Sequence, residues 1–378
     1  MIPQALFVLF AVCSAFASFH DFGIPEQSAT VDVRAFNVGN LSIVGAASAV
    51  FSPTLPGHES VTLAMHAFLV EHPPTKTRLM FDLGLRKDVE NFPSAISSVF
   101  DAGVFAVNEE KDITQLLVDG GVPLETIDTV IWSHAHFDHI GDMSKFPNTT
   151  RLVMGSETDT SIYPANPNAT LQASDLVGRN VTKIDFSKAT LEFSGLAAID
   201  YFGDGSFYLM STPGHFPGHI TALARVSPSS FVLLGGDTFH NPGELRPRPA
   251  FQRAYPCPAD ILALTRSSIS TDFFWSPRSQ IGRFDLPSRA QQLLAISDEK
   301  GAFVVYTDPA QSQVSLEKIA TFDADADFFV LIAHDASVVK ELPYFPRYLN
   351  GWKESGVKNR TAWRFVEKSS LAFVFGEK

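Results

Sequence analysis

The sequence has little cysteine, a deficit of positive charge, and no long apolar run beyond its first residues. Two cysteines in 378 residues are too few for a disulfide framework, so the fold must rest on its hydrophobic core. Lysine and arginine number 29 against 41 acidic residues, a formal net charge of −12. This balance argues against nucleic acid and anionic membranes, which both attract clustered positive charge. We therefore expect a small-molecule substrate, with no nucleic-acid or membrane partner and with the oligomeric state left open.

The longest apolar run lies at the N-terminus and has the pattern of a signal peptide. It extends from Ala5 to Ala17, shorter than the roughly 20 residues that a membrane-spanning helix needs. Ala15-Phe16-Ala17 is a small-x-small cleavage pattern, which predicts a signal peptide over residues 1–17. The alternative is a buried N-terminal strand or helix.

Five N-x-S/T motifs independently favour export. They begin at Asn40, Asn148, Asn168, Asn180 and Asn359. Cleavage after Ala17 would remove Cys13 and leave Cys257, between two prolines, as the one thiol. We therefore predict a secreted glycoprotein in which Cys257 is a small apolar residue rather than a nucleophile, because no base flanks it.

Short strand-like runs, broken by glycine, proline, asparagine and aspartate, dominate the rest of the chain. Strands are predicted at 31–36, 64–70, 78–84, 151–155, 197–202, 206–212, 220–226, 231–236, 302–307 and 328–334. Helices are predicted at 108–121, 258–268, 286–298 and 312–321. This mixture predicts an α/β sandwich. With no repeat or dividing linker visible, we expect one catalytic domain over 18–378, with an insertion at about 240–285.

The densest cluster of polar residues is "IWSHAHFDHIGD", residues 131–142, which holds three of the 11 histidines. The apolar run before it predicts a buried strand, so the histidines fall at its end, where functional groups are common. In extended backbone His134 and His136 project to the same side and can hold one cation. Asp138 and His139 follow at a turn and can reach a neighbouring position. A polar surface loop is the alternative, but three imidazoles and a carboxylate at this spacing favour a metal site.

Three further ligand-type side chains end apolar runs elsewhere in the chain. They are His215 in "STPGHFPGH", Asp237 in "VLLGGD" and His334 in "FVLIAH". Loops held by buried strands at one sheet edge give a preorganised site. Imidazole and carboxylate ligands suit Zn²⁺ and leave room for water.

In these residues the chain resembles the metallo-β-lactamase superfamily. H-x-H-x-D-H, T-P-G-H, G-G-D and the last histidine occur in family order, and Asp82 in "LMFDLG" resembles the earlier strand-end aspartate of the family. The resemblance implies a four-layer αββα sandwich with a dinuclear site at the sheet edge, usually holding two zinc ions. It implies that one ion is held by His134, His136 and His215, that the other is held by Asp138, His139 and His334, and that Asp237 bridges them.

The resemblance also implies a hydrolase. Metal ions can lower the pKa of bound water to about 7 from 15.7, which supplies a nucleophile at neutral pH. With aspartate as bridge and no cysteine near these loops, opening of a lactone or lactam is the leading prediction. A glyoxalase-II-like thioesterase is the alternative. A phosphodiesterase is less favoured because of the negative charge and the predicted export.

Two residues are predicted to take part in catalysis beside the ions. Lactonases of this family often place a tyrosine three residues after the bridging aspartate, and here that position is His240. We expect His240 to donate a hydrogen bond to the developing oxyanion. Asp138 is the second predicted catalytic residue.

Other residues are expected to support the site. His219 and Asp82 are predicted either to orient metal ligands through hydrogen bonds or to be ordinary turn residues. Arg246, Arg248 and Arg253 lie in the irregular 240–285 segment. They are predicted either to engage a substrate carboxylate or carbonyl or to belong to a surface excursion.

Overall fold

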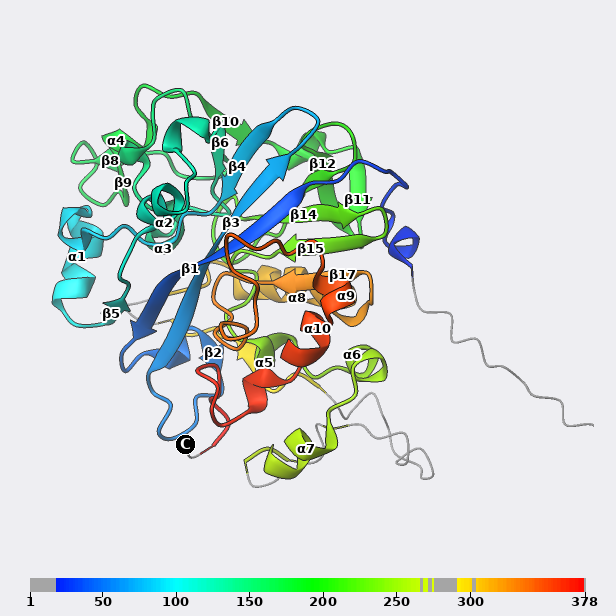
Figure 1. Ribbon diagram of the computed structural model, residues 1–378. Coiled ribbons are helices and arrows are strands. Elements are labelled where there is room, and N and C mark those ends of the chain that lie inside the picture. Colours follow the sequence, from blue (N-terminus) through cyan, green and yellow to red (C-terminus); the bar gives the residue numbers. More distant parts are fainter. Residues whose placement is uncertain (1–17, 266–267, 271–273, 275–290, 301–303, 377–378) are drawn as a thin grey trace, which may run out of the picture.

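A computed structural model describes residues 18–265, 268–270, 274, 291–300 and 304–376, and the predicted signal peptide lies outside these ranges. Two large β-sheets form the centre of the molecule (Figure 1). Within the described residues, no helix is both long and apolar enough to cross a membrane.

The first sheet has seven strands in the order β10-β7-β6-β4-β3-β1-β5. Their bounds are β1 (Asp32–Ile43), β3 (Val61–His72), β4 (Thr77–Phe81), β5 (Phe105–Asn108), β6 (Thr129–Ile131), β7 (Arg151–Gly155) and β10 (Val181–Ile184). β3 and β4 form an antiparallel hairpin across the Pro-rich turn, whereas β4, β6, β7 and β10 run parallel to one another. The carboxyl ends of β4 and β6 therefore meet at one edge.

The second sheet has six strands in the order β11-β12-β13-β14-β15-β17. Their bounds are β11 (Leu191–Phe193), β12 (Leu196–Asp200), β13 (Phe207–Ser211), β14 (Ile220–Ser227), β15 (Ser230–Leu234) and β17 (Phe328–Leu331). Neighbouring strands are antiparallel except β15 and β17, which are parallel and so end at the same edge. Two small sheets pair β2 (Phe51–Ser52) with β16 (Ala295–Ile296) and β8 (Ile162–Tyr163) with β9 (Leu171–Gln172).

Ten α-helices surround the sheets within the described residues. They are α1 (Ser94–Asp101), α2 (Ile113–Asp119), α3 (Phe137–Ile140), α4 (Ala173–Leu176), α5 (Pro242–Leu245), α6 (Pro249–Ala254), α7 (Ala259–Thr265), α8 (Pro309–Ala324), α9 (Trp352–Ser355) and α10 (Val357–Thr361). The predicted helices at 108–121, 258–268 and 312–321 correspond to α2, α7 and α8, with residues 266–267 outside the described chain.

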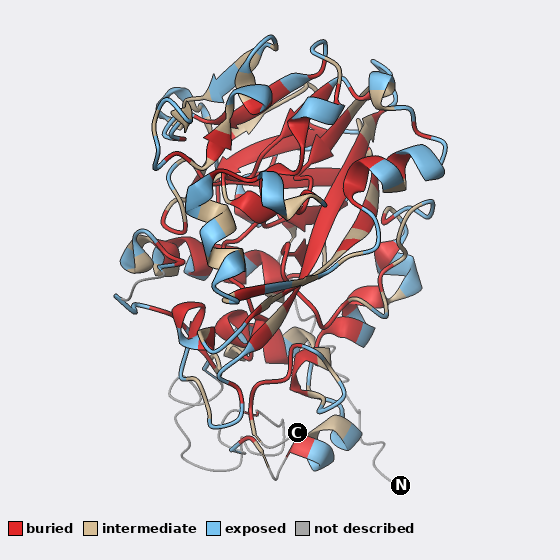
Figure 2. Cartoon of the chain, turned by 90° about the vertical axis from the view of Figure 1, so that its left-hand side faces the viewer, coloured by how far each residue is buried: buried red, intermediate tan, exposed pale blue. Residues whose placement is uncertain are grey.

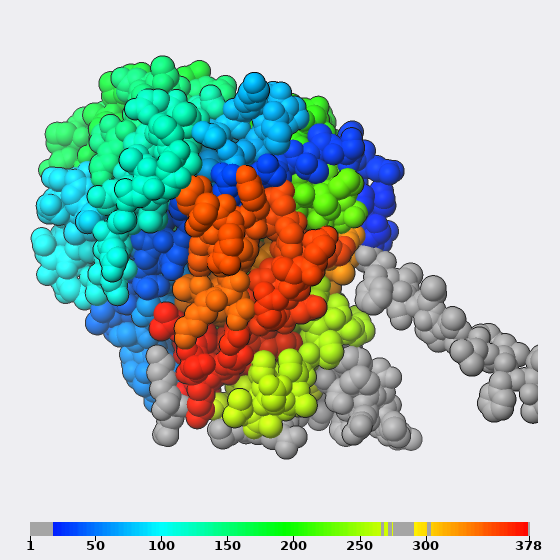
Figure 3. Space-filling model, viewed as in Figure 1, coloured from blue at the N-terminus to red at the C-terminus, as the bar shows by residue number. Residues whose placement is uncertain are grey.

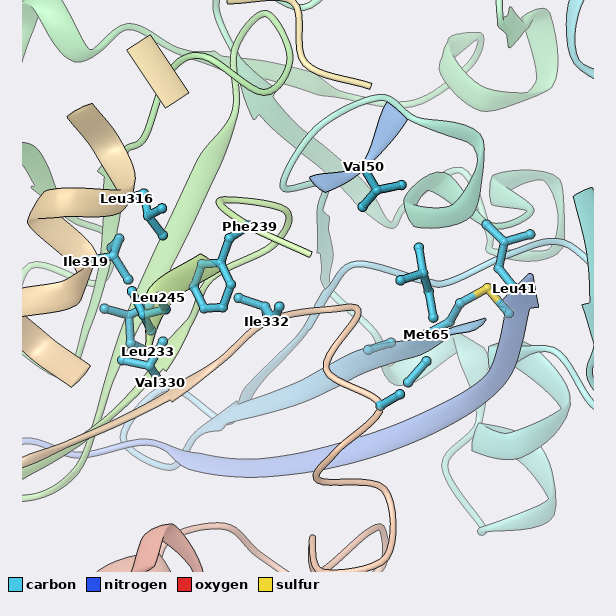
Figure 4. Close-up of a cluster of buried hydrophobic side chains, with 14 of the residues drawn as sticks. Leu41, Val50, Met65, Leu233, Phe239, Leu245, Leu316, Ile319, Val330 and Ile332 are labelled. Atoms are coloured by element: carbon cyan, nitrogen blue, oxygen red, sulfur yellow. The ribbon is translucent and has the colours of Figure 1, made fainter. Parts of the chain in front are cut away.

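The layers are held by two hydrophobic clusters, one between the sheets and one beneath the helices. Buried side chains of the first sheet, such as Phe68, belong to one cluster with those of the second, such as Leu209. Figure 4 shows Leu316 of α8 on the side of Leu233 and Val330, which come from β15 and β17. In Figure 2 the strands are almost wholly buried, while many helices have exposed outer surfaces. The predicted αββα sandwich is confirmed.

The C-terminal part of the chain returns to the first sheet. In Figure 3 it lies across one face of the molecule, coloured orange to red. The Phe345 amide donates to the Ala35 carbonyl at 2.8 Å and the Leu349 amide to the Val33 carbonyl at 2.8 Å. These bonds fix the segment that follows β17 beside β1.

The predicted strand at 302–307 is wrong for its described part, since residues 304–307 are irregular and 301–303 lie outside the described chain. The Thr307 amide donates to the carbonyl of His215 at 2.9 Å instead of to a neighbouring strand. This apolar run therefore packs against the loop after β13. The alternation of apolar residues along the sequence does not indicate such a contact.

The predicted helix at 286–298 is also wrong over residues 291–298, where the chain instead contributes β16, and 286–290 lie outside the described chain. The Leu293 and Leu294 amides donate to carbonyls of Arg246 and Gly243, at 3.1 and 2.9 Å. Tertiary hydrogen bonds thus override the local helical pattern.

Candidate metal centre

The structure brings all seven predicted metal ligands together at one edge of the two sheets. They occupy loops or short turns that follow strands: His134 and His136 after β6, Asp138 and His139 in α3, His215 after β13, Asp237 after β15, and His334 after β17. All are buried except His136, which is partly exposed. The buried strands position them as expected from the sequence pattern.

Three imidazoles form the first group. His134 Nε2 lies 2.8 Å from His136 Nδ1, and His215 Nε2 lies 3.1 and 3.0 Å from these two nitrogens. Tetrahedral Zn–N bonds of about 2.0–2.1 Å would place ligand nitrogens about 3.3 Å apart. Burial, reinforced by the neighbouring imidazoles, holds the pKa of His134 and of His215 well below the ordinary value. Their converging nitrogens therefore carry lone pairs suited to one shared cation.

The second group combines two imidazoles and a carboxylate. His334 Nε2 lies 3.3 Å from both His139 Nε2 and Asp138 Oδ2, and His139 Nε2 lies 3.9 Å from the same carboxylate oxygen. These three ligand atoms are close enough to hold a second ion.

Asp237 occupies the space between the two groups. Its Oδ2 atom lies within 4 Å of five imidazole nitrogens: His334 at 3.1 Å, His139 at 3.2 Å, His240 at 3.2 Å, His215 at 3.5 Å and His134 at 3.8 Å. Its Oδ1 atom is buried and has no hydrogen-bond partner among the residues that the structure describes. A buried carboxylate oxygen in this state fits a cation, because such groups are costly unless paired.

The charges of the cluster also fit a cation. Burial opposes a charge on His334, but the carboxylates of Asp237 and Asp138 outweigh burial and raise its pKa to about 10. Burial likewise opposes a charge on Asp237, but His139 and His334 hold the pKa of Asp237 well below its usual range. Without a metal ion, protons on these imidazoles supply the positive charge that the carboxylates need. A bound metal ion would displace those protons and supply the charge instead.

Asp82 supports the ligands from the end of β4. Its Oδ2 atom accepts hydrogen bonds from His139 Nδ1 at 2.9 Å and from Ser133 Oγ at 2.8 Å. Its backbone has φ of 59°, an uncommon conformation for a residue other than glycine. On the other sheet His334 Nδ1 donates to the Ala64 carbonyl at 2.8 Å. The bonds made by Nδ1 of His139 and by Nδ1 of His334 leave Nε2 of each ring directed at the cluster.

His219 positions the backbone of Asp237. The Asp237 amide donates to His219 Nε2 at 3.0 Å, so His219 Nδ1 carries the proton and donates to Thr212 Oγ1 at 2.8 Å. Burial lowers the pKa of His219 to about 3, which keeps the imidazole neutral. Gly236 permits this approach, because a Cβ there would lie 2.9 Å from His219 Nε2. Of the two interpretations of His219, the contacts support the orienting one.

Replacing His219 with phenylalanine is expected to weaken metal binding by about 10- to 100-fold, because the amide of Asp237 loses its acceptor. Affinity can be measured by competition with a chromophoric chelator. The matched control is His72→Phe, since His72 is equally buried and bonds Thr75 and Asp204 through its two ring nitrogens. An equal loss of affinity in both variants would show that general destabilisation is the cause.

The predicted catalytic residues both line the cavity above the cluster, and His240 is buried there with 4% of its surface exposed. Its Nε2 faces Asp237, while its Nδ1 lies 2.6 Å from the hydroxyl of Tyr306, and that hydroxyl lies 3.1 Å from Glu244 Oε1. Tyr306 and Glu244 were not among the residues predicted for the site. "NPGE" does carry the signature of a helix-capping box, but nothing local indicates the contact with Tyr306.

None of the three predicted arginines lines this cavity. Arg246 is buried in a bidentate pair with Asp323, Arg248 pairs with the exposed Glu317, and Arg253 is exposed. The prediction that they engage substrate is therefore wrong. The ion pairs of Arg246 and Arg248 instead connect α5 and α6 to α8.

The cavity and its open mouth hold about 400 Å³ of empty space, and the cavity has a strong division between polar and apolar surfaces. Its polar end consists of the two predicted catalytic residues with His136, Asp237 and His334. Its other described lining residues are all apolar: Leu41, Ile43, Leu63, Phe105, Phe137, Val304 and Val305.

Comparisons with known proteins agree with this geometry. A family model described as the metallo-beta-lactamase superfamily matches residues 64–326. The chain is 36% identical over 355 residues to the metallo-hydrolase mfmC of Annulohypoxylon moriforme, covering 91% of this chain and 88% of mfmC. It is 33% identical over 362 residues to the gamma-lactamase FDB1 of Fusarium pseudograminearum, covering 90% and 83% of the two chains.

Some relatives are much longer than this chain. The cytochrome P450 monooxygenase mpaDE' of Penicillium brevicompactum is 36% identical over 91% of this chain, which spans 38% of that relative. Among solved structures, a B. thuringiensis AiiA mutant with N-decanoyl-L-homoserine bound at its active site has a TM-score of 0.54 and 17% identity, covering 85% of this chain and 99% of AiiA. Its likeness supports the fold. The chain therefore belongs to the metallo-beta-lactamase superfamily and is a metal-dependent hydrolase.

Proposed function

We propose that this hydrolase opens an uncharged lactam or lactone ring that carries an apolar body. The observation that carries the proposal is the cavity, whose polar end is the candidate metal centre and whose other described walls are apolar. The scissile carbonyl would face the polar end and the ring system would contact Leu63 and Phe105.

The same lining disfavours the two alternative reactions. A glutathione thioester or a phosphodiester brings negative charge, and no described residue that lines the cavity is basic other than histidine. Burying an unpaired charge against apolar walls is costly. The name of the relative FDB1, a gamma-lactamase, supports a cyclic amide as the first substrate to test.

We propose that two divalent ions, with zinc expected, occupy the centre. His134, His136 and His215 would hold one ion, Asp138, His139 and His334 would hold the other, and Asp237 would contact both. When bound, the ions would supply an activated water and a Lewis acid for the carbonyl. The chain itself positions the ligands through Asp82 and His219, excludes bulk water with its apolar walls, and offers His240 as a hydrogen-bond donor.

Metal-loaded protein should be assayed against a matched substrate panel. It comprises an aromatic-fused γ-lactam, the corresponding γ-lactone, the same rings bearing a carboxylate, a glutathione thioester and a phosphodiester. We expect the highest kcat/KM for an uncharged ring, with the carboxylate lowering it by about 10- to 100-fold. Preference for the thioester or the phosphodiester would refute the proposal.

We also propose that residues 18–378 form one catalytic domain and that the mature protein is secreted with N-linked sugar. In support, Asn148, Asn168, Asn180 and Asn359 are exposed, whereas Asn40 lies in β1 with its side-chain oxygen buried. Intact mass of protein from a secretory host, before and after glycosidase treatment, tests this. Retention of Met1 with an unchanged mass would count against it.

A further inference from the structure

A chain of three buried side chains runs from behind the candidate metal centre into the cavity. Glu244, Tyr306 and His240 are exposed by 0%, 2% and 4% of their surface. The Tyr306 hydroxyl lies 3.1 Å from Glu244 Oε1 and 2.6 Å from His240 Nδ1. The Tyr306 ring packs edge-on against both His240 and His215, with centroids 5.2 Å apart in each case.

The hydrogen-bond partners at both ends of this chain restrict where its protons lie. His240 Nε2 faces Asp237 Oδ2 at 3.2 Å, and a carboxylate that is ionised only accepts hydrogen bonds. His240 Nε2 therefore carries a proton. In the tautomer whose one proton is on Nε2, Nδ1 accepts from the Tyr306 hydroxyl, 2.6 Å away.

The hydrogen bonds of Tyr306 also determine the protonation of Glu244. If the Tyr306 hydroxyl donates to His240, its oxygen is free to accept from Glu244 Oε1, which requires Glu244 to be protonated there. The other oxygen, Oε2, accepts from the amides of His240 and Asn241, both at 2.7 Å. Burial raises the pKa of Glu244 to about 8, in agreement with a protonated carboxyl group.

We propose that Tyr306 and Glu244 are positioning residues that hold His240 in the tautomer with its proton on Nε2. All three donors then point the same way: Glu244 to Tyr306, Tyr306 to His240, and His240 into the cavity. There His240 can donate to the oxygen of the substrate carbonyl as charge develops on it. This assignment rests on the proposed hydrolysis of a cyclic amide or ester. The imidazole of His240 would then take the place of the tyrosine hydroxyl expected at this position in related lactonases.

The first test is Tyr306→Phe, which keeps the ring packing and removes the hydroxyl. In the zinc-loaded full chain we expect kcat to fall by about 10- to 100-fold, with KM and metal content near those of the wild type. The matched control is Tyr208→Phe, because Tyr208 is also fully buried but lies in β13 away from the cavity. It should leave kcat unchanged.

The second test, Glu244→Gln, examines the direction of the hydrogen bonds. Glutamine reproduces a protonated Glu244, because its oxygen can accept from the two amides while its NH₂ group donates to Tyr306. We expect this variant to keep most of the wild-type kcat. A loss as large as that of Tyr306→Phe, with metal retained, would mean that Glu244 is an acceptor and would overturn the proposal.

A readout independent of turnover comes from nitrogen NMR of histidine-labelled protein, with the His240 signals assigned by their loss in His240→Gln. We expect a protonated Nε2 and an unprotonated Nδ1 in the wild type and in Glu244→Gln, and a changed Nδ1 signal in Tyr306→Phe. If no cyclic substrate is turned over, the proposed function fails while the spectrum still decides the tautomer. A proton on Nδ1 of His240, or loss of metal in Tyr306→Phe, would overturn the assignment.

Discussion

Asp237→Asn is expected to abolish hydrolysis and to empty both metal positions, because this one carboxylate serves both groups of ligands. Its Oδ2 atom contacts His215 of the first group at 3.5 Å and His334 of the second at 3.1 Å. Asparagine keeps the shape but removes the charge that offsets two cations. Metal ions contribute several kcal/mol to such reactions, so the rate should fall at least about 1,000-fold. Elemental analysis of protein purified without chelators should show well under two ions per chain.

Two variants make this result specific. His334→Ala removes a ligand from the second group alone and should chiefly deplete one ion. Asp175→Asn neutralises another buried aspartate, which lies in α4 and accepts from the Gln172 amide. It should keep the wild-type metal content and rate. Full activity in metal-free protein would contradict both the prediction and the proposed role of the ions.

Arg246→Met is expected to lower the free energy of unfolding by about 3–5 kcal/mol, because it leaves a buried carboxylate without its partner. Arg246 donates to both oxygens of Asp323, at 2.8 and 2.7 Å, and to the Ala362 carbonyl at 3.1 Å. Its guanidinium also lies 4.6 Å from the ring centroid of Phe251. One side chain therefore joins α5, α6, α8 and the segment after α10. Urea denaturation measures the loss.

The double variant Arg246→Met, Asp323→Leu should recover most of this stability, since an apolar pair often replaces a buried ion pair at little cost. Arg253→Met, at an exposed position, should change the free energy by less than about 0.5 kcal/mol. Below the temperature at which Arg246→Met unfolds, its kcat/KM should match the wild type. A rise in KM for Arg246→Met with an unchanged kcat would instead indicate that Arg246 binds substrate, contrary to the structure.

The seven clustered ligands could be predicted because each follows a strand that the apolar pattern reveals. Parallel neighbours such as β15 and β17 end at one edge, so Asp237 and His334 had to lie close together once the sheet formed. The sandwich itself could be predicted for the same reason. Strand periodicity is a local property, and the ligands are attached directly to it.

The wall and the support of the cavity could not be predicted in this way. Val304, Val305 and Tyr306 have the composition of a strand, yet their apolar side chains line or underlie a cavity rather than a sheet face. Tyr306 reaches His240 across 66 positions of the chain, and no local pattern records such a contact. Arg246 illustrates the opposite error, since a basic residue near a metal motif suggested recognition but its partner is a buried aspartate.

The ligands do not come from one sheet, and this division affects how the molecule holds together. His134 to His139 belong to the first sheet, whereas His215, Asp237 and His334 belong to the second, and the outermost ligands are 200 positions apart. Bound ions would cross-link the two sheets of the sandwich, so the sheets could separate during unfolding only if the metal dissociated. In a chain with only two cysteines, catalysis and cross-linking would then depend on the same few atoms.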